Sequence, residues 1–318
     1  MRRPLPGTLA QRSLGVAAGL LLDRALGEPP DRWHPVAGFG TVMGRLERRV
    51  HADARTPGVV YALAGAGLGA LAGVLLHRAT GGRPVPAVAV AVQVASAGRM
   101  LRRTATAIGQ RLEDDDLEGA RARLPWLVGR DPSALDASGV AAAVVESLAE
   151  NTVDAVVAPA FWGLVAGAPG ALVHRAVNTM DAMVGHRSPR YARFGTAAAR
   201  ADDVLACVPA RLFAGLVAVL AGPQHAGHVL RTVYRDAPAH PSPNAGVAEA
   251  AFAGALGVRL GGPLRYGERL EHRPTLGQGP RPGPADIARA RLLVDRAELL
   301  MVAACVALWC LARRTRRT

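Results

Sequence analysis

The stretch "AVVESLAENTVDAVVAPAFWG", residues 143–163, joins a polar motif directly to a long apolar run. Glu146, Glu150 and Asp154 recur at every fourth position, and Asn151 stands among them. On a helix this spacing places the three carboxylates on one face, where they repel unless a cation or an Arg compensates them. A solvated helix start is the structural alternative, because acids stabilise the N-terminal end of a helix. Ionisable groups at the border of a membrane segment are, however, functional candidates.

The rest of the chain places this motif in a membrane protein. Hydrophobic residues make up 50% of the 318 residues, but only 4% are aromatic. The apolar residues gather in six segments, several of which are near the length that crosses a bilayer. The segments are 14–22, 58–76, 85–97, 153–173, 204–221 and 297–312. We therefore expect one all-α, polytopic integral membrane domain over residues 1–318, with about four to five apolar helices and some re-entrant segments. The alternative is a soluble, Ala-rich protein with buried helices.

The apolar segments differ in how they are interrupted. Residues 58–97 read as a helical hairpin whose turn is "HRATGGRP", residues 77–84. Residues 99–149 have polar and apolar residues at helical spacing, and 222–289 read as a large loop rich in Pro and Gly. The run 153–173 contains Pro and Gly, so it either kinks or enters the membrane and returns. If it returns, all the polar motifs share one face.

Charge narrows the function further. The formal net charge is +13, and the chain has no Lys. A phosphate must then be met by Arg, backbone amides or a metal, because a P-loop lysine is unavailable. Basic residues cluster beside apolar runs, which favours anionic membrane lipid over nucleic acid; these are Arg99, Arg102, Arg103, Arg313, Arg314, Arg316 and Arg317. The three Cys residues form no CxxC pair and read as small buried hydrophobic residues.

Two further motifs repeat the combination of acid, amide and Arg. "NTMD" places Asn178 and Asp181 on one helical face, and "ARADDV" places Arg200 beside Asp202 and Asp203. Oxygen-rich groups of this kind coordinate Mg²⁺, which bridges substrate phosphates. The alternative is Arg–Asp pairing that fixes helix packing.

Two other stretches are dense in polar residues. "DRALGEPPDRWHPVAGFG" (23–40) contains His34, and "SPNAG" (242–246) contains Ser242, which suits a helix cap, and Asn244, which suits a cap or a ligand contact. The residues alone predict an integral membrane protein with an acidic, Mg²⁺-dependent site for an anionic ligand. An enzyme and a transporter both satisfy that description.

These motifs, in this order from Asp23 to Tyr266, resemble the CobD/CbiB family of cobalamin biosynthesis, the adenosylcobinamide-phosphate synthases. They are "DRALGEPPDRWHPVAGFG", "ESLAENTVDAVVAPAFWGLVAGAPGALVHRAVNTMDAMVGH", "FGTAAARADDVLACVPARL" and "SPNAGVAEAAFAGALGVRLGG". Glu28, Ala182, His186 and Ala206 depart from residues common in the family, which puts any role of those side chains in doubt.

The resemblance implies a carbon–nitrogen ligase. Such an enzyme joins adenosylcobyric acid to (R)-1-amino-2-propanol or its O-phosphate, with ATP and Mg²⁺, and the corrinoid is a substrate and not a cofactor. The implied partners are these substrates, membrane lipid and other late cobalamin-assembly enzymes, without nucleic acid. The implied location is the cytoplasmic membrane with the site facing the cytoplasm. An AmpE-like membrane sensor and a transporter of an anionic or corrinoid solute are the alternatives.

The resemblance and the motifs together give a set of site residues. The catalytic candidates are acids: Glu146, Glu150, Asp154, Asp181, Asp202 and Asp203. The candidate Mg²⁺ ligands among them are Asp202, Asp203, Asp181 and Glu150. The substrate-binding candidates are amides, guanidinium groups and an imidazole: Asn151, Asn178, Arg200, Arg211, Asn244 and His34. Arg200 and Arg211 suit phosphate oxygens, and a carboxylate or His34 suits the base that deprotonates the amine.

Overall fold

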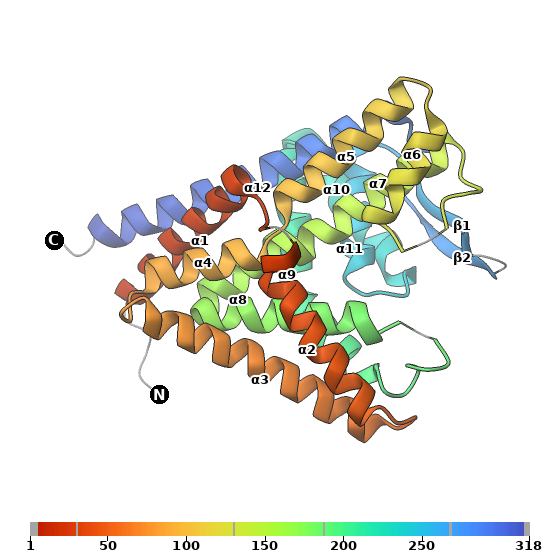
Figure 1. Cartoon of the computed structure of the whole chain (residues 1–318). Helices are drawn as coiled ribbons and strands as arrows, with labels where there is room; N and C mark the ends of the chain where they lie inside the picture. The colour runs from red at the N-terminus through yellow and green to blue at the C-terminus, as the bar shows by residue number, and fades with distance from the viewer. Residues whose placement is uncertain (1–5, 30, 130, 187, 267–268, 315–318) are drawn as a thin grey trace. The chain divides into compact units, whose positions relative to one another are not determined.

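A computed structural model describes residues 6–29, 31–129, 131–186, 188–266 and 269–314 (Figure 1). Arg316 and Arg317, two of the predicted lipid-facing residues, lie outside the described residues. The chain forms two compact units, which are described separately. The first comprises 1–99, 154–206 and 301–318, and the second comprises 100–153 and 207–300. The expectation of a single domain over 1–318 stays a prediction.

The first unit is built from helices. The elements that lie entirely in this unit are α1 (Pro6–Leu26), a 3₁₀ turn (Asp31–Trp33), α2 (Pro35–Val50), α3 (Arg55–Ala79), α4 (Pro84–Ala95) and α8 (Ala158–Val184). Two helices are shared between the units, namely α9 (Thr196–Leu220) and α12 (Pro284–Arg314). A π-helical turn, Val153–Val157, leads into α8. The predicted hairpin of residues 58–97 is confirmed: α3 and α4 are joined by a short turn in which Gly81 and Gly82 adopt positive φ.

Helix α3 has its small residues inside and its large apolar residues outside. Gly65, Gly69 and Gly73 are buried against α8, and a Cβ atom at Gly69 would stand 2.8 Å from the Leu172 carbonyl oxygen. The opposite face exposes large apolar side chains: Val59, Val60, Leu63, Leu71, Val74 and Leu75. A helix of a soluble protein buries such residues, whereas a membrane helix packs through its small residues and turns the large ones to lipid.

Helix α8 is a helical hairpin. Gly167 has φ 71° and ψ −157°, a conformation open only to Gly, and Pro169 follows it. The Asn178 side chain hydrogen-bonds that of Asp154, although a straight helix would separate residues 24 positions apart by about 36 Å. The chain from Asp154 to Gly167 rises about 20 Å, less than the roughly 30 Å hydrocarbon core. The chain therefore reverses its direction at Gly167, and the two ends of this stretch meet.

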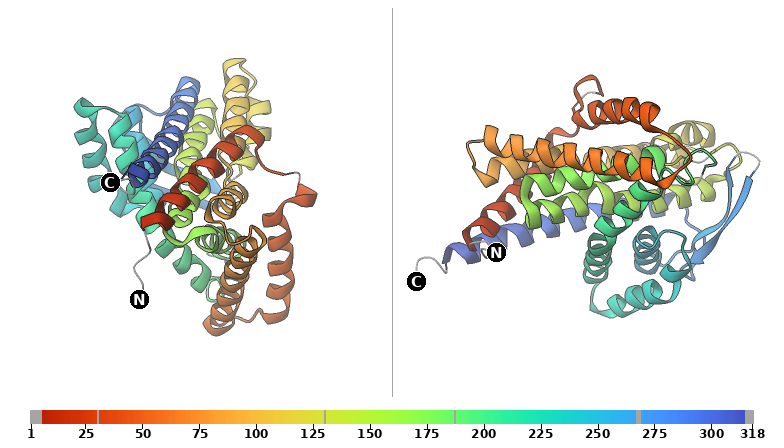
Figure 2. Two further views of the ribbon diagram at one scale, coloured as in Figure 1. Left: turned by 90° about the vertical axis from the view of Figure 1, so that its left-hand side faces the viewer. Right: turned by 90° about the horizontal axis from the view of Figure 1, so that it is seen from below.

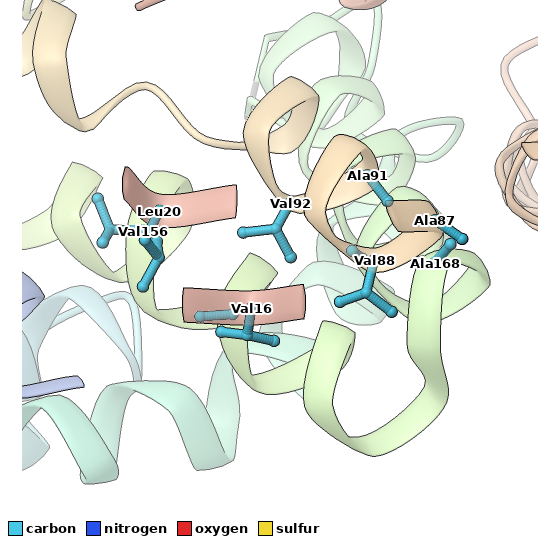
Figure 3. Packing of buried hydrophobic residues seen from close by; sticks show 10 residues of the cluster. Val16, Leu20, Ala87, Val88, Ala91, Val92, Val156 and Ala168 are labelled. Carbon is cyan, nitrogen blue, oxygen red and sulfur yellow. The ribbon is translucent and has the colours of Figure 1, made fainter. Parts of the chain in front are cut away.

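The core of the first unit holds this hairpin in place. Small and β-branched side chains of α1, α4, the π-helical turn and both arms of α8 pack together, and the ribbon bends sharply beside Ala168 (Figure 3). The members of the cluster are Val16, Leu20, Ala87, Val88, Ala91, Val92, Val156, Ala160, Ala168 and Ala171. Trp162 on the first arm donates a 3.0 Å hydrogen bond to the Leu205 carbonyl oxygen, which ties the arm to the start of α9.

The second unit is also mainly helical. Its whole elements are α5 (Gly98–Glu113, whose first residues belong to the first unit), α6 (Leu117–Arg123), α7 (Ala137–Thr152), α10 (Pro223–Asp236), α11 (Ala245–Leu256), β1 (Leu260–Tyr266) and β2 (Arg269–Leu276), with 3₁₀ turns at Leu124–Trp126 and Ala237–Ala239. Helix α11 is buried along most of its length, and Ser242 accepts a hydrogen bond from the Ala245 amide at its start, as predicted. Figure 2 shows the same ribbon from two further directions.

The expectation that residues 222–289 form a loop was wrong. This region holds α10, α11, the antiparallel pair β1–β2 and the start of α12. Its many Gly and Pro residues mark the ends of short elements: Gly222 precedes α10, Gly257 ends α11 in the left-handed conformation, and Pro284 opens α12.

Four helical stretches of the described residues are long and apolar enough to cross a membrane: Arg55–Ala79, Pro84–Glu113, Ala137–Val184 and Thr196–Leu220. Ala245–Leu256 is a further apolar helix but is shorter. The expected all-α, polytopic membrane class is confirmed. The second stretch is interrupted at Ser96, which is extended, and the third contains the hairpin of α8. Helices α1 and α12, which carry the predicted segments 14–22 and 297–312, are not among these four described stretches.

Candidate functional site

Three of the sequence motifs meet in the first unit at Asn178. Its Nδ2 atom donates to Asp154 Oδ2 at 3.1 Å and to Asp202 Oδ1 at 3.4 Å. The three side chains come from separate segments, namely the π-helical turn, the second arm of α8 and the second turn of α9. The reversal at Gly167 makes this meeting possible. We call these three residues the carboxylate–amide cluster.

A half-buried cation lies beside the cluster. Arg175, one helical turn before Asn178, has its Nη1 atom 3.5 Å from Asn178 Oδ1 and lies within electrostatic range of Glu28 and Asp154. Arg175 also lines an apolar cavity of about 120 Å³ formed with α2, α3 and α4. Sequence reasoning missed this residue. An Arg inside an apolar segment, three positions before Asn178, was the signal that could have found it.

The predicted residue His34 begins α2. Its Nδ1 atom accepts a 3.2 Å hydrogen bond from the Val36 amide, so the neutral ring carries its proton on Nε2. Nε2 lies 3.8 Å from Glu28 Oε1. The motif of residues 23–40 therefore reaches the neighbourhood of Arg175 through Glu28, and His34 has a capping role.

Two further predicted acids lie near one another in the same unit. Asp181 is one turn after Asn178, and Asp203 follows Asp202. The charge of Asp203 acts on Asp181, as does that of His186. Arg200, the remaining candidate of this motif, is exposed on α9.

The acids of the opening motif divide between the units. Glu146 and Glu150 lie on α7 in the second unit, whereas Asp154 lies in the π-helical turn of the first. Because a π turn bonds residue i to i+5, the single stripe expected from a continuous α-helix does not extend to Asp154. Glu146 is 5% exposed and accepts a 2.8 Å hydrogen bond from the Gly261 amide of β1. Glu150 is exposed.

The remaining predicted amides are bonded within the second unit. Asn151 donates to the Ser147 carbonyl and hydroxyl oxygens, each at 2.9 Å. Arg211 donates to Asn244 Oδ1 at 2.7 Å and contacts the Pro243 carbonyl oxygen, so two predicted substrate-binding residues pair with each other. His240 and Glu249, both buried, approach to 3.7 Å. Sequence reasoning did not pair these two, although Glu249 stands on a helix of small residues.

The structure corrects one expectation about the basic residues. Arg102, predicted to face lipid, is 8% exposed and pairs with Glu298 and, at 3.3 Å, with Asp295 of α12. A buried guanidinium requires such acidic partners because an unpaired charge in the interior is costly. Arg103, the next residue, is exposed.

The donor set of the carboxylate–amide cluster fits a hard divalent cation. Two carboxylates, Asp154 and Asp202, lie on either side of the Asn178 amide, and Mg²⁺ is commonly held by one or two carboxylates together with substrate phosphates. The described residues contain no group of three or more His, Cys, Asp and Glu side chains that could hold a metal ion by themselves. The cluster thus suits a cation shared with a phosphate ligand and not a closed structural metal site.

Fold and site define a helical membrane protein in which a helical hairpin carries a carboxylate–amide cluster. The family model described as CobD/Cbib protein matches residues 16–294. The cobalamin biosynthesis protein CobD of Mycobacterium tuberculosis is 49% identical over 290 residues, which cover 90% of this chain and 92% of that protein. The proteins of the same name from Chromobacterium violaceum and Rhodobacter capsulatus are 44% and 43% identical, covering 92% and 89% of this chain and 95% and 92% of their own lengths. The chain belongs to the CobD/CbiB family. No solved structure matches it.

Proposed function

We propose that this protein acts in cobalamin biosynthesis and forms the amide bond between adenosylcobyric acid and (R)-1-amino-2-propanol or its O-phosphate. The observation that supports this most directly is the contact of Asn178 with Asp154 and Asp202, because it joins three motifs that the chain shares with the family's pattern. A carboxylate is a poor acyl donor, so the reaction needs an energy source. If ATP is that source, the carboxylate, the amine and one ATP give the amide together with either ADP and phosphate or AMP and pyrophosphate.

The carboxylate–amide cluster would hold Mg²⁺ through Asp154 and Asp202, with Asp181 and Asp203 as further candidates in the same unit. When bound, the ion would neutralise charge on the ATP phosphates. Asn178 would orient the two carboxylates, and Arg175 would keep this acidic group compatible with a buried position. Arg200, exposed two residues before Asp202, remains the candidate for phosphate oxygens in this unit.

The attacking amine must lose a proton before it forms the amide. A carboxylate of the site is the better candidate for the base, because the Nδ1 lone pair of His34 accepts the Val36 amide proton and Nε2 carries the ring proton. In the first unit, Asn178 would contact an amide side chain of the corrin. The protein would work in the cytoplasmic membrane with this site on the cytoplasmic side, beside the enzymes of the last assembly steps.

The test is a growth assay in a strain that lacks its own synthase. The intact gene should restore growth on cobyric acid, and the double variant Asp202→Ala, Asp203→Ala should not. Asp53→Ala is the matched control, since its side chain is 69% exposed in the same unit and lies outside the cluster. No growth with the intact gene, despite protein in the membrane, would overturn the proposal.

A second assay identifies the chemistry. Purified protein receives adenosylcobyric acid, ATP, Mg²⁺ and either aminopropanol or its O-phosphate, and mass spectrometry follows the amide product. ADP as the coupled product indicates an acyl phosphate, and AMP indicates an acyl adenylate. Cobinamide formation without nucleotide consumption would contradict the ligase assignment.

A further inference from the structure

A second cavity lies in the first unit at the turn of the α8 hairpin. It has a volume of about 420 Å³. It is lined by the start of α1, the end of α3, the start of α4 and the turn of α8, with Thr8, Arg12, Val74, His77, Arg78, Gly82, Pro84, Val88, Ala166, Gly167, Ala168 and Pro169. Nothing in the proposed reaction uses these residues.

This cavity is basic. Arg12, His77 and Arg78 line it, and no acidic residue does. Among the described residues, no carboxylate forms an ion pair with Arg12 or Arg78. Arg12 donates one hydrogen bond, of 2.6 Å, to the Val165 carbonyl oxygen, which fixes the guanidinium against the hairpin turn. Two cations of constant charge therefore converge on a space that offers them no carboxylate partner.

Two helix starts add to the positive potential. Helix α4 begins at Pro84, and the second arm of α8 begins directly after Gly167; both positions line the cavity. Pro84, Pro86 and Pro169 carry no amide proton, so these two helix starts contribute mainly the positive ends of their dipoles. Together with the guanidinium groups they form a site for an anion with several oxygen atoms, for which phosphate is the common biological example.

The cavity is separate from the carboxylate–amide cluster. Gly167 and Asn178 are about 16 Å apart along the second arm of α8, and Arg12 lies in the first half of α1, whereas Glu28 follows the end of that helix. Its rim is apolar on one side: Val74 lines it, and Leu71 and Leu75 of the same helix are exposed by 52% each. A ligand there meets cations with one end and a membrane-like surface with the other.

We propose that this cavity binds a phosphate group, and that the apolar face of α3 beside it selects an anionic phospholipid as the carrier. The phosphate lies among Arg12, His77 and Arg78, and the acyl chains follow Val74 and its exposed neighbours. Basic pockets between membrane helices recognise lipid headgroups in this way.

The experiment measures lipid binding by the full-length protein. Purified protein in phosphatidylcholine nanodiscs is titrated with phosphatidylglycerol, and the thermal unfolding midpoint and the lipid retained in native mass spectrometry are recorded. Arg78→Gln should weaken binding of phosphatidylglycerol about fivefold, as expected for one basic residue at an anionic surface. Arg83→Gln is the matched control, because Arg83 is exposed in the same turn and does not line the cavity.

The outcomes separate the sources of the phosphate. A saturable rise of the midpoint with phosphatidylglycerol, kept in Arg83→Gln and reduced in Arg78→Gln and His77→Gln, supports the lipid. The same pattern with inorganic phosphate alone supports a phosphate site but overturns the lipid assignment. Equal losses in Arg78→Gln and Arg83→Gln indicate attraction to surface charge only and overturn the proposal. The midpoint of each variant in phosphatidylcholine alone verifies that it is folded.

Discussion

Replacing Asn178 by Asp tests the carboxylate–amide cluster with almost no change in side-chain shape. The variant Asn178→Asp loses the Nδ2 donor that serves Asp154 at 3.1 Å and Asp202 at 3.4 Å. The 3.1 Å hydrogen bond to a charged group contributes about 1.5–3 kcal/mol, and the 3.4 Å contact contributes less because it is longer than a usual hydrogen bond. The new carboxylate also repels Asp154 and Asp202 by up to about 4 kcal/mol for each pair near 4 Å at an effective dielectric constant of 20. Its attraction to Arg175, whose Nη1 atom lies 3.5 Å from Asn178 Oδ1, offsets about one of these two repulsions.

The assay is thermal unfolding of the purified protein in detergent between pH 5 and pH 9, with and without Mg²⁺. At pH 8 without Mg²⁺ we expect the intact protein to be the most stable, Asn178→Ala to be less stable and Asn178→Asp to be the least stable, because Ala removes the donor without adding charge. As the pH falls, the introduced carboxyl binds a proton and the repulsion disappears, so Asn178→Asp should approach Asn178→Ala. Mg²⁺ should also restore Asn178→Asp. Equal stability of Asn178→Asp and the intact protein at pH 8 without Mg²⁺ would refute the contact between these three side chains.

Two further predictions concern packing and pH. Gly69→Val should destabilise the protein by about 1–3 kcal/mol through overpacking, because the new Cβ stands 2.8 Å from the Leu172 carbonyl oxygen; Gly67→Val, which meets nothing within 4 Å, is the control, and equal unfolding midpoints would contradict the helix contact. The hydrogen bonds of Arg235 and the Gly277 amide hold the pKa of Asp236 below its ordinary value. A depressed pKa stabilises the fold above about pH 4 and the effect is lost as the pH falls further. The protection factor of the Gly277 amide, which corrects exchange for its intrinsic pH dependence, should therefore fall below about pH 4 in the intact protein and change less in Asp236→Asn.

The membrane class and several elements could be predicted from composition and periodicity. The segments 58–76 and 85–97 became α3 and α4, because long apolar runs and a Gly/Pro turn leave few alternatives. The structure also brings Asn178 of the second motif within 3.4 Å of Asp202 of the third, and their shared role in a site stays a prediction. Residues 222–289 could not be predicted correctly, because the Gly and Pro residues that end their short helices and strands are also the residues typical of loops.

The exact way in which the first two motifs meet could not be predicted. Gly and Pro near Gly167 indicate an interruption, but the sequence does not distinguish a kink from a reversal, since that depends on the φ of one glycine and on packing against α1, α3 and α4. The π-helical turn at Asp154 has no reliable sequence signal either. The expected stripe of three carboxylates, Glu146, Glu150 and Asp154, assumed a continuous α-helix, which this turn interrupts. Glu146 illustrates a third limit, because its partner is the amide of Gly261, far away in the chain.

The most direct test of the account is the distance between residues 154 and 178. Cys207, Cys305 and Cys310 are free and can be replaced by Ser, and spin labels are then attached to Asp154→Cys and Asn178→Cys. Electron paramagnetic resonance of the protein in nanodiscs should show strong dipolar broadening, because the α8 hairpin brings the two labels side by side. A separation near 36 Å, expected for an unbroken helix over these 24 positions, would contradict the hairpin and the site that depends on it.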